Sequence, residues 1–418
     1  MKIRILPIVV LLILSMIVLW ILCPAIARKI SAEDGHNLCN EQNSGEPISP
    51  STATPRPSPT PSAKPEPIYK YYSLTESKPN FDLSMHVLEL NLSNPELVFR
   101  PVLSHKTLFG YEYLSVMYDT WQAKVAVNAG FSHSNGMLGG LFAMDGELYT
   151  SATGNFPVLF LDKEKAYIED ALSKVWVEGD GISLDNLFHN RYSKAEGIYI
   201  FTPSYGTMNR LDLNHLNAVI SNGEVRGLIQ RNSSYEIPKD GFLISAIGNK
   251  AKAKLEKLVK PGMNLEFKYD IYKGEQSITG YDWAYECGSW ILKDYEIVAP
   301  EKDGWVGTMQ TRVPRTAVGI KEDGTVVFLV ADGRQKGLSD GLTGKELGQK
   351  LLDLGVKDAV NLDGGASSEM IVEGKIVNSP SAGRERMLPC GFIVSQSVTG
   401  TVLLTLLLTF FLPLHASL

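Results

Sequence analysis

The sequence predicts an α/β fold, with a mixed and strand-rich sheet system and a βαβ unit near the C-terminal end of the folded domain. Short apolar or alternating runs are separated by Gly, Asn and Asp, which is typical of strands and tight turns. One segment near the C-terminal end has the pattern strand, helix, strand instead. Because 44% of the residues are hydrophobic and 21% are charged, the chain can build a sizeable globular core.

Residues 1–27 are predicted to be a membrane anchor or signal segment. Lys2 and Arg4 precede an uncharged run rich in Leu, Ile and Val, and about 20 apolar residues span a bilayer as a helix. A cleaved signal peptide has a shorter apolar region, which favours an uncleaved anchor, but Ala25-Ile26-Ala27 has the form of a cleavage site. Either way, the positive flank leaves the rest of the chain outside the cytoplasm. With the favoured anchor, the protein is predicted at the cell membrane with its folded domain on the extracytoplasmic side.

Two segments are predicted to flank the folded domain. Residues 28–68 contain the run EPISPSTATPRPSPTPSAKPEP, a composition that cannot bury a core and favours an extended, polyproline-like stalk. Residues 396–418 are largely apolar, but their uncharged run is short for a membrane-spanning helix. A second membrane contact, a removed anchor signal and an unconstrained tail all remain open. The folded domain is therefore expected at 69–395.

Strands and hairpins are expected through the first half of this domain. Residues 85–92 alternate between apolar and polar side chains, as a half-buried strand does. An Asp-Gly or Asn-Gly pair separates apolar runs in 140–149 and in 217–229, and the same pattern recurs around Asp323. Such pairs are the strongest short signal of a β-hairpin, so we expect antiparallel sheets with inserted helices.

The βαβ unit follows this last hairpin. Val326–Val330 is a continuous apolar run typical of a buried strand. Thr343 and Glu346 have the spacing of a helix capping box, and Gly355 stands where a helix C-terminus would be capped. Residues 359–362 give the second buried strand. The two strands of such a unit are parallel, so their carboxyl ends should meet at one edge of the sheet.

Each of these two strands is followed by an aspartate and a glycine. Asp332 follows the first strand and Asp363 follows the second, so both carboxylates are expected at the edge where ligands gather. A plain turn is the usual meaning of one Asp-Gly step, but two at one edge point to a site. Gly364 and Gly365 would let the backbone approach a ligand and expose N–H groups to an anion.

Arginines and serines near the two aspartates suit a phosphate-bearing ligand. Arg315 follows a proline in RVPRTAVG, and Arg334 lies in ADGR. A guanidinium group binds phosphate with two parallel hydrogen bonds, although a surface ion pair is the plain alternative for Arg315. Ser367 and Ser368 can donate to phosphate oxygens or cap a turn.

Five runs together resemble the phosphodiester glycosidase family: PRTAVGI, VADGR, GLTGKELGQKLLDLG, DAVNLDGGASSEM and GKIVNSPSAGRERMLPCGFIV. The resemblance covers 312–394. Upstream, AVNAGFSHSNG is similar to the family's Asn-Gly-Gly-Phe-Phe segment but has Ala129 in place of a glycine and Ser132 in place of a phenylalanine. The resemblance, together with the predicted N-terminal anchor, implies an extracytoplasmic hydrolase that cleaves the glycosidic bond of a sugar 1-phosphodiester on a cell-surface or exported glycan.

The resemblance also implies roles for individual residues. Asp363 is the first choice, and Asp332 the second, for a carboxylate that attacks the anomeric carbon or activates water there. Asn128 matches the family's Asn, and Arg384 resembles an Arg that closes over the phosphate. The expected substrate-binding residues are Arg315, Arg334, Asn128, Gly364, Gly365, Ser367, Ser368 and Arg384.

Composition limits the partners and cofactors. A formal net charge of −6 without a basic patch argues against nucleic acid as a partner. The four cysteines lack zinc-ligand spacing, and no cofactor is implied. Cys287 and Cys390 either form a disulfide or remain buried thiols.

Two other functions remain open from the sequence. The first is a metal-dependent phosphodiesterase in which a divalent cation binds Asp332, Asp363 and Glu369. The second is a non-catalytic, membrane-tethered module that binds a polysaccharide or takes part in its biosynthesis.

Overall fold

The computed structural model describes residues 67–397 of the 418-residue chain. The predicted anchor, almost all of the predicted stalk and nearly all of the predicted tail lie outside these residues and stay predictions. None of the helices within 67–397 is both long and apolar enough to cross a membrane.

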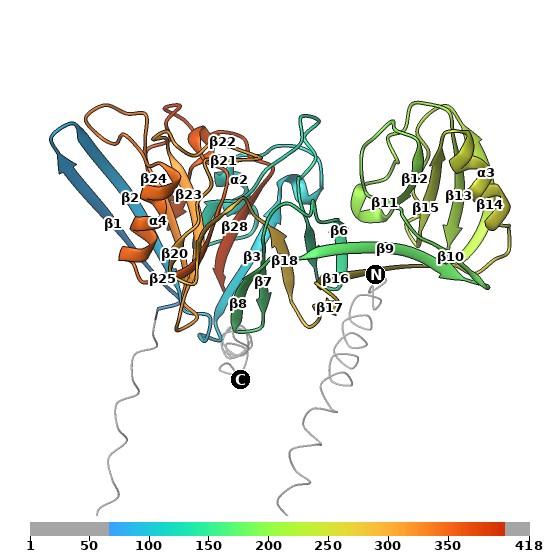
Figure 1. The fold of residues 1–418 in the computed structure, drawn as a ribbon, viewed down its shortest axis with the longest axis horizontal. Coiled ribbons are helices and arrows are strands. Elements are labelled where there is room, and N and C mark those ends of the chain that lie inside the picture. Colours follow the sequence, from blue (N-terminus) through green and yellow to red (C-terminus); the bar gives the residue numbers. More distant parts are fainter. Residues whose placement is uncertain (1–66, 398–418) are drawn as a thin grey trace, which may run out of the picture. The chain divides into compact units, whose positions relative to one another are not determined.

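The largest sheet has seven strands, and every neighbouring pair in it is antiparallel. In order across the sheet they are β1 (Tyr69–Lys78), β2 (Phe81–Leu90), β24 (Val326–Ala331), β23 (Arg315–Lys321), β25 (Val356–Asn361), β19 (Trp290–Lys293) and β20 (Glu296–Ile297). Helix α4 (Gly344–Asp353) packs on one face (Figure 1), where Leu347 and Leu351 join the apolar residues of β23–β25. The opposite face of this sheet lines the main core.

A second sheet of five antiparallel strands packs against that core. Its strands, in order, are β27 (Lys375–Ile376), β26 (Met370–Val372), β4 (Val125–Asn128), β28 (Cys390–Gln396) and β3 (Leu97–Leu103). Phe392 of β28 meets Phe328 of β24 with ring centroids 5.4 Å apart, so aromatic packing joins the two sheets. Helix α2 (Leu114–Thr120) covers the outer face of the second sheet (Figure 1).

Three further sheets complete the described chain. One contains β6 (Glu147–Thr150), β5 (Phe142–Met144), β18 (Trp283–Glu286), β7 (Val158–Asp162) and β8 (Lys165–Glu169). Another contains β10 (Ile182–Leu184), β9 (Leu172–Gly179), β16 (Glu266–Lys273) and β17 (Gln276–Ser277). The last contains β11 (Phe188–His189), β12 (Gly197–Phe201), β15 (Gly241–Ile247), β13 (His215–Ser221) and β14 (Glu224–Arg231), with α3 (Asn249–Leu258) beside it.

Short elements lie between these sheets. They are the hairpin of β21 (Lys302–Asp303) and β22 (Gly307–Thr308), and the 3₁₀ turns η1 (Ser104–Lys106), η2 (Pro203–Tyr205) and η3 (Gly365–Ser367).

The predicted strand-rich α/β class is confirmed, and the βαβ segment is more elaborate than the sequence suggested. Strands β24 and β25 both run antiparallel to β23, so they run in the same direction. They are not neighbours, because β23 lies between them and pairs with both. The capping box of α4 is present: Thr343 accepts the Glu346 N–H and donates its own N–H to the Glu346 carboxylate. Gly355 has a φ of 80°, as a helix-ending glycine does.

The structure also separates the two alternatives left open for the cysteines. Cys287 and Cys390 are both buried and both free thiols. The Cys390 sulfur lies 2.9 Å from the Tyr285 hydroxyl, so it packs as a core group with a weak polar contact.

Candidate functional site

The site lies at the sheet edge where β24 and β25 end and β23 begins. Register places Arg315 of β23 opposite Ala331, the last residue of β24, and Ala317 opposite Asn361, the last residue of β25. The segments that follow β24 and β25 therefore leave the sheet at the same side at which β23 begins.

Asp363 is held at this edge by the end of β4. Its N–H donates to the Ala129 carbonyl at 2.9 Å, and its carbonyl accepts the Asn128 side-chain amide at 2.6 Å. The Asn128 amide oxygen in turn accepts from the Thr316 hydroxyl and from the Glu369 N–H. Asn128 is fully buried and both ends of its amide are used, so it positions Asp363 and is not free to bind a sugar hydroxyl.

The turn after Asp363 requires glycine. Gly365 has a φ of +63°, and its N–H donates to the Pro314 carbonyl. A Cβ on Gly364 would lie 3.0 Å from that carbonyl oxygen, and a Cβ on Gly365 would lie 3.2 Å from Nη1 of Arg334. The exposed Arg334 side chain therefore lies directly against the backbone of this turn.

The carboxylate of Asp363 lies among polar groups that favour its charged form. Its Oδ1 accepts the Gly364 N–H at 2.9 Å, and the Ser367 hydroxyl is a second hydrogen-bond donor. Arg386 donates to the Ser367 oxygen at 3.0 Å and adds a positive charge. Burial nevertheless raises the pKa of Asp363 above its ordinary value, against the opposing effects of Ser367 and Arg386.

Asp303 is a second acid near this cluster that the sequence analysis did not identify. It is fully buried, and its oxygens accept the N–H groups of Ser289, Trp305 and Val306 at 2.8, 2.6 and 2.9 Å. Its negative charge contributes to the raised pKa of Asp363. A signal was present in the sequence, because Asp303 is followed by Gly304 in one more Asp-Gly step.

Arg315 lies behind the site and is largely tied to the backbone. Only 1% of it is exposed, and it donates to the carbonyls of Leu342 and Thr311 at 3.0 and 3.1 Å. Burial, opposed by the Asp303 carboxylate and reinforced by the positive charge of Arg334, lowers the pKa of Arg315 to about 10. Arg315 thus contributes positive charge near the site, while its hydrogen-bond donors are already in use.

Asp332 is enclosed by its own hydrogen bonds. Only 2% of it is exposed. Its oxygens accept from the Ser84 hydroxyl at 3.0 Å, the Asn378 amide at 3.2 Å and the Ser379 N–H at 2.8 Å. No hydrogen bond or ion pair within residues 67–397 joins it to Asp363. This geometry fits a residue that ties the end of β24 to neighbouring segments better than one that contacts a substrate.

The two remaining predicted residues also differ in their surroundings. Ser368 is buried, and its hydroxyl oxygen lies 3.1 Å from the Thr316 hydroxyl oxygen, so it supports the turn from behind. Arg384 is exposed and makes no hydrogen bond or ion pair in the described part of the chain. Arg386, two residues later, is the arginine that reaches Ser367, and the sequence analysis did not identify it.

Glu369 is a buried carboxyl beside the site. Only 1% of the residue is exposed, and its Oε1 has no hydrogen-bond partner among residues 67–397. Burial, with a smaller effect from the negative charge of Glu385, raises the pKa of Glu369 to about 8. Glu369 is therefore protonated over much of the range in which a free glutamate is charged.

This pKa predicts a pH-dependent stability. A carboxyl whose pKa is higher in the folded chain stabilises the fold at low pH, and this contribution is lost as the pH rises from about 4.5 to about 8. We expect Glu369→Gln to remove that loss, so that urea midpoints at pH 5 and pH 8 lie closer together in the variant than in the parent. Equal pH dependence in both proteins would contradict the assignment.

The acids do not gather as a metal site. Within residues 67–397 no group of three His, Cys, Asp or Glu side chains is placed to hold a metal ion. Asp332, Asp363 and Glu369 therefore do not form the shared ligand set that the metal-dependent alternative requires.

Comparison with known proteins supports the resemblance seen in the sequence. Residues 214–395 match the model of the phosphodiester glycosidase family. The chain is 36% identical over 103 residues to the SPbeta prophage-derived uncharacterized protein YomE of Bacillus subtilis (strain 168), a match covering 25% of this chain and 16% of that protein. It is 30% identical over 110 residues to N-acetylglucosamine-1-phosphodiester alpha-N-acetylglucosaminidase of Bos taurus, covering 25% of this chain and 20% of that protein.

A solved structure shows the same fold over a longer stretch. A hypothetical protein from Synechocystis superposes with a TM-score of 0.67 at 18% identity, over 78% of this chain and 62% of that chain. The predicted family resemblance is thus confirmed for residues 214–395. The chain spans at most about a fifth of the curated relatives it matches.

Proposed function

We propose, on the premise that residues 214–395 carry a phosphodiester glycosidase domain, that the protein hydrolyses the glycosidic bond of a sugar 1-phosphodiester on a cell-surface or exported glycan. One observation carries the proposal: the Asp363 carboxylate shares a sheet edge with Ser367, Arg386 and Arg334. A carboxylate for the anomeric carbon and cations for a phosphate thus lie side by side.

The chemistry needs both kinds of group. The bond between the anomeric carbon and the phosphate oxygen breaks, the phosphate leaves with the electron pair, and water supplies the new hydroxyl of the sugar. Positive charge develops on the sugar ring, so the Asp363 carboxylate acts at the anomeric carbon. The departing phosphate carries negative charge, which Arg334 and Arg386 stabilise.

Other residues position this machinery. Asn128 holds the backbone of Asp363, and Arg315 holds the entry to β23. Asp332 fixes the segment that carries Arg334 two residues later. In this proposal none of these three touches the substrate.

Two arginines separated by one residue allow a matched test of the phosphate contact. Arg386→Gln should lower kcat/KM by about 100-fold, because it removes a charge-assisted donor from the leaving group. Arg384→Gln should leave kcat/KM within about twofold of the parent, because the Arg384 side chain is exposed and has no polar contact within residues 67–397. Steady-state kinetics on one sugar 1-phosphodiester checks both. Equal losses would contradict the assignment.

The reaction itself is tested with isotopically labelled water. The protein is incubated with a panel of sugar 1-phosphodiesters, and the products are analysed by mass spectrometry. Label in the sugar shows cleavage of the C–O bond, as proposed, whereas label in the phosphate shows attack at phosphorus. If the protein turns over no member of a broad panel, the hydrolase proposal is contradicted and the non-catalytic binding module is favoured.

We also propose that the domain is tethered outside the cytoplasm. Support comes from the sequence pattern of 1–27 and from the stalk composition of 28–68. Protease added to intact cells should release a fragment that contains the folded domain, and complete protection of that domain would contradict the proposal.

A further inference from the structure

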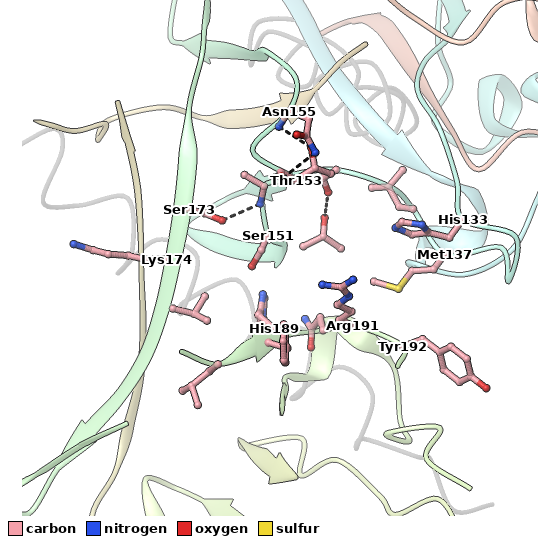
Figure 2. Close-up of a pocket in the computed structure, with 18 of the residues that line it drawn as sticks. His133, Met137, Ser151, Thr153, Asn155, Ser173, Lys174, His189, Arg191 and Tyr192 are labelled. Carbon is pink, nitrogen blue, oxygen red and sulfur yellow. Dashed lines mark hydrogen bonds between the residues drawn. The ribbon is translucent and has the colours of Figure 1, made fainter. Parts of the chain in front are cut away.

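A cavity of about 790 Å³ has none of the residues of the Asp363 cluster in its lining. Its lining comes from 133–140, 150–155, the first half of β9 and the segment 186–192 (Figure 2). A volume of this size suits a ligand of several sugar rings better than a single ion. The hydrolysis proposed above does not use this cavity.

The cavity lining includes two basic residues, Lys174 and Arg191. It contains no Asp or Glu, although the whole chain has a formal net charge of −6. Lys174 lines it but pairs with Asp270 at 3.4 Å, and its ammonium points away from the cavity (Figure 2). The Arg191 guanidinium lies 5.4 Å from the Phe188 ring and forms no ion pair within residues 67–397. Arg191 is therefore the free cation of this cavity and suits an anionic ligand.

His189 is the second observation that points to a ligand. Only 4% of it is exposed, it is one of the residues that line the cavity, and neither ring nitrogen has a hydrogen-bond partner among the described residues. Burial lowers the pKa of His189 to about 3, so the ring is neutral and offers one donor and one acceptor. A ligand hydroxyl that displaced part of the lining would give this ring partners, which buried polar groups normally have.

The cavity continues toward the proposed active site. Thr153 and Asn155 line both this cavity and a second one of about 580 Å³, which Trp305 and Ser289 also line. The N–H groups of Trp305 and Ser289 both bind Asp303, whose charge acts on Asp363. The Trp305 ring stacks on Phe131 and gives the second cavity an aromatic wall, a surface on which sugar rings commonly pack.

We propose that these two cavities form a groove for an anionic glycan, with Arg191 binding a phosphate group of the polymer remote from the bond that is cleaved. His189 would bind a sugar hydroxyl of the same segment. The inference rests on the proposed function and deepens it, because it assigns a phosphate-bearing polymer as the substrate in place of a small sugar 1-phosphodiester.

The length of the glycan substrate is the variable that tests this proposal in kinetics. The parent should turn over an oligomer of several sugar-phosphate repeats with a higher kcat/KM than a substrate containing a single phosphodiester. Arg191→Gln should lower kcat/KM for the oligomer by about tenfold, the effect of one lost charge-assisted hydrogen bond, and leave the short substrate unchanged. Arg231→Gln is the matched control, because Arg231 is also an exposed arginine, 5.2 Å from the Tyr235 ring, but lies outside the groove.

Direct binding separates this proposal from the proposed reaction. Calorimetry with Asp363→Asn and the same oligomer avoids turnover, and a neutral oligosaccharide of equal length measures the anionic contribution. If binding depends on Arg191 but the parent turns over no substrate, the proposed hydrolase activity is contradicted and the proposed groove is supported. Equal binding of both glycans, or binding unaffected by Arg191→Gln, would overturn the groove and leave the reaction untouched.

His189→Phe distinguishes a ligand contact from a structural role. Phenylalanine keeps the stacking on Phe267, whose ring centroid lies 5.0 Å away, and removes two unpaired nitrogens. We expect a thermal midpoint at least equal to that of the parent together with about tenfold weaker binding of the oligomer. Unchanged binding would exclude His189 from the groove.

Discussion

Replacing Asp363 with asparagine is expected to lower turnover of a sugar 1-phosphodiester by about 10²–10⁴-fold while the fold remains intact. The substitution removes the negative charge that, in the proposed reaction, acts at the anomeric carbon. It keeps the size of the side chain and an oxygen that can accept the Gly364 N–H, and the backbone contacts with Ala129 and Asn128 do not involve the side chain.

The measurement is kcat at substrate saturation, accompanied by the urea midpoint of each protein. Because burial raises the pKa of Asp363, the charge of the carboxylate opposes folding at neutral pH. The variant should therefore lose at most about 1 kcal/mol of folding stability relative to the parent. A variant that keeps more than about a tenth of the parent kcat would show that another group acts at the anomeric carbon.

Replacing Asp332 with leucine is expected to cost about 3–5 kcal/mol of folding stability, one of the largest effects that a single substitution can have here. Leucine leaves the Ser84 hydroxyl, the Asn378 amide and the Ser379 N–H without their acceptor in a buried place. Each unpaired buried donor costs roughly 1–3 kcal/mol. Urea denaturation followed by circular dichroism measures the loss.

Asp332→Asn is the matched variant. Asparagine keeps one acceptor oxygen and should cost about 1–2 kcal/mol, so the protein should fold and retain most of its activity. An Asp332→Asn protein that is as stable as the parent but as inactive as Asp363→Asn would place Asp332 in the reaction and contradict its role as a positioning residue.

Local patterns in the sequence predicted the elements of the fold better than their arrangement. The capping box and Gly355 identify α4, and the apolar run at 326–330 identifies a buried strand, because these signals depend only on neighbours in the chain. The position of β23 between β24 and β25 depends on pairing across the sheet, which local periodicity does not encode.

The candidate site divides in the same way. Asp363 and the glycine turn could be located from the sequence, because a strand followed by Asp-Gly-Gly is a local pattern. Asp303 also stands in an Asp-Gly step, but the sequence does not show that Asp303 and Arg386 belong to the site, because only tertiary contacts bring them close to Asp363. The resemblance to a family directed attention to Arg384, but the course of the loop brings Arg386 to Ser367 instead.

The place of β4 in its sheet has a consequence for the choice of expression boundaries. β4 lies between β26 and β28, and β2 lies beside β24, yet both β4 and β2 precede the family-matched stretch 214–395. That stretch expressed alone would leave β24, β26 and β28, and also β15 and β18, without strands that they pair with. Such unpaired backbone groups promote association between chains. Soluble recombinant protein should therefore require a boundary upstream of β1, and shorter versions should accumulate as aggregates.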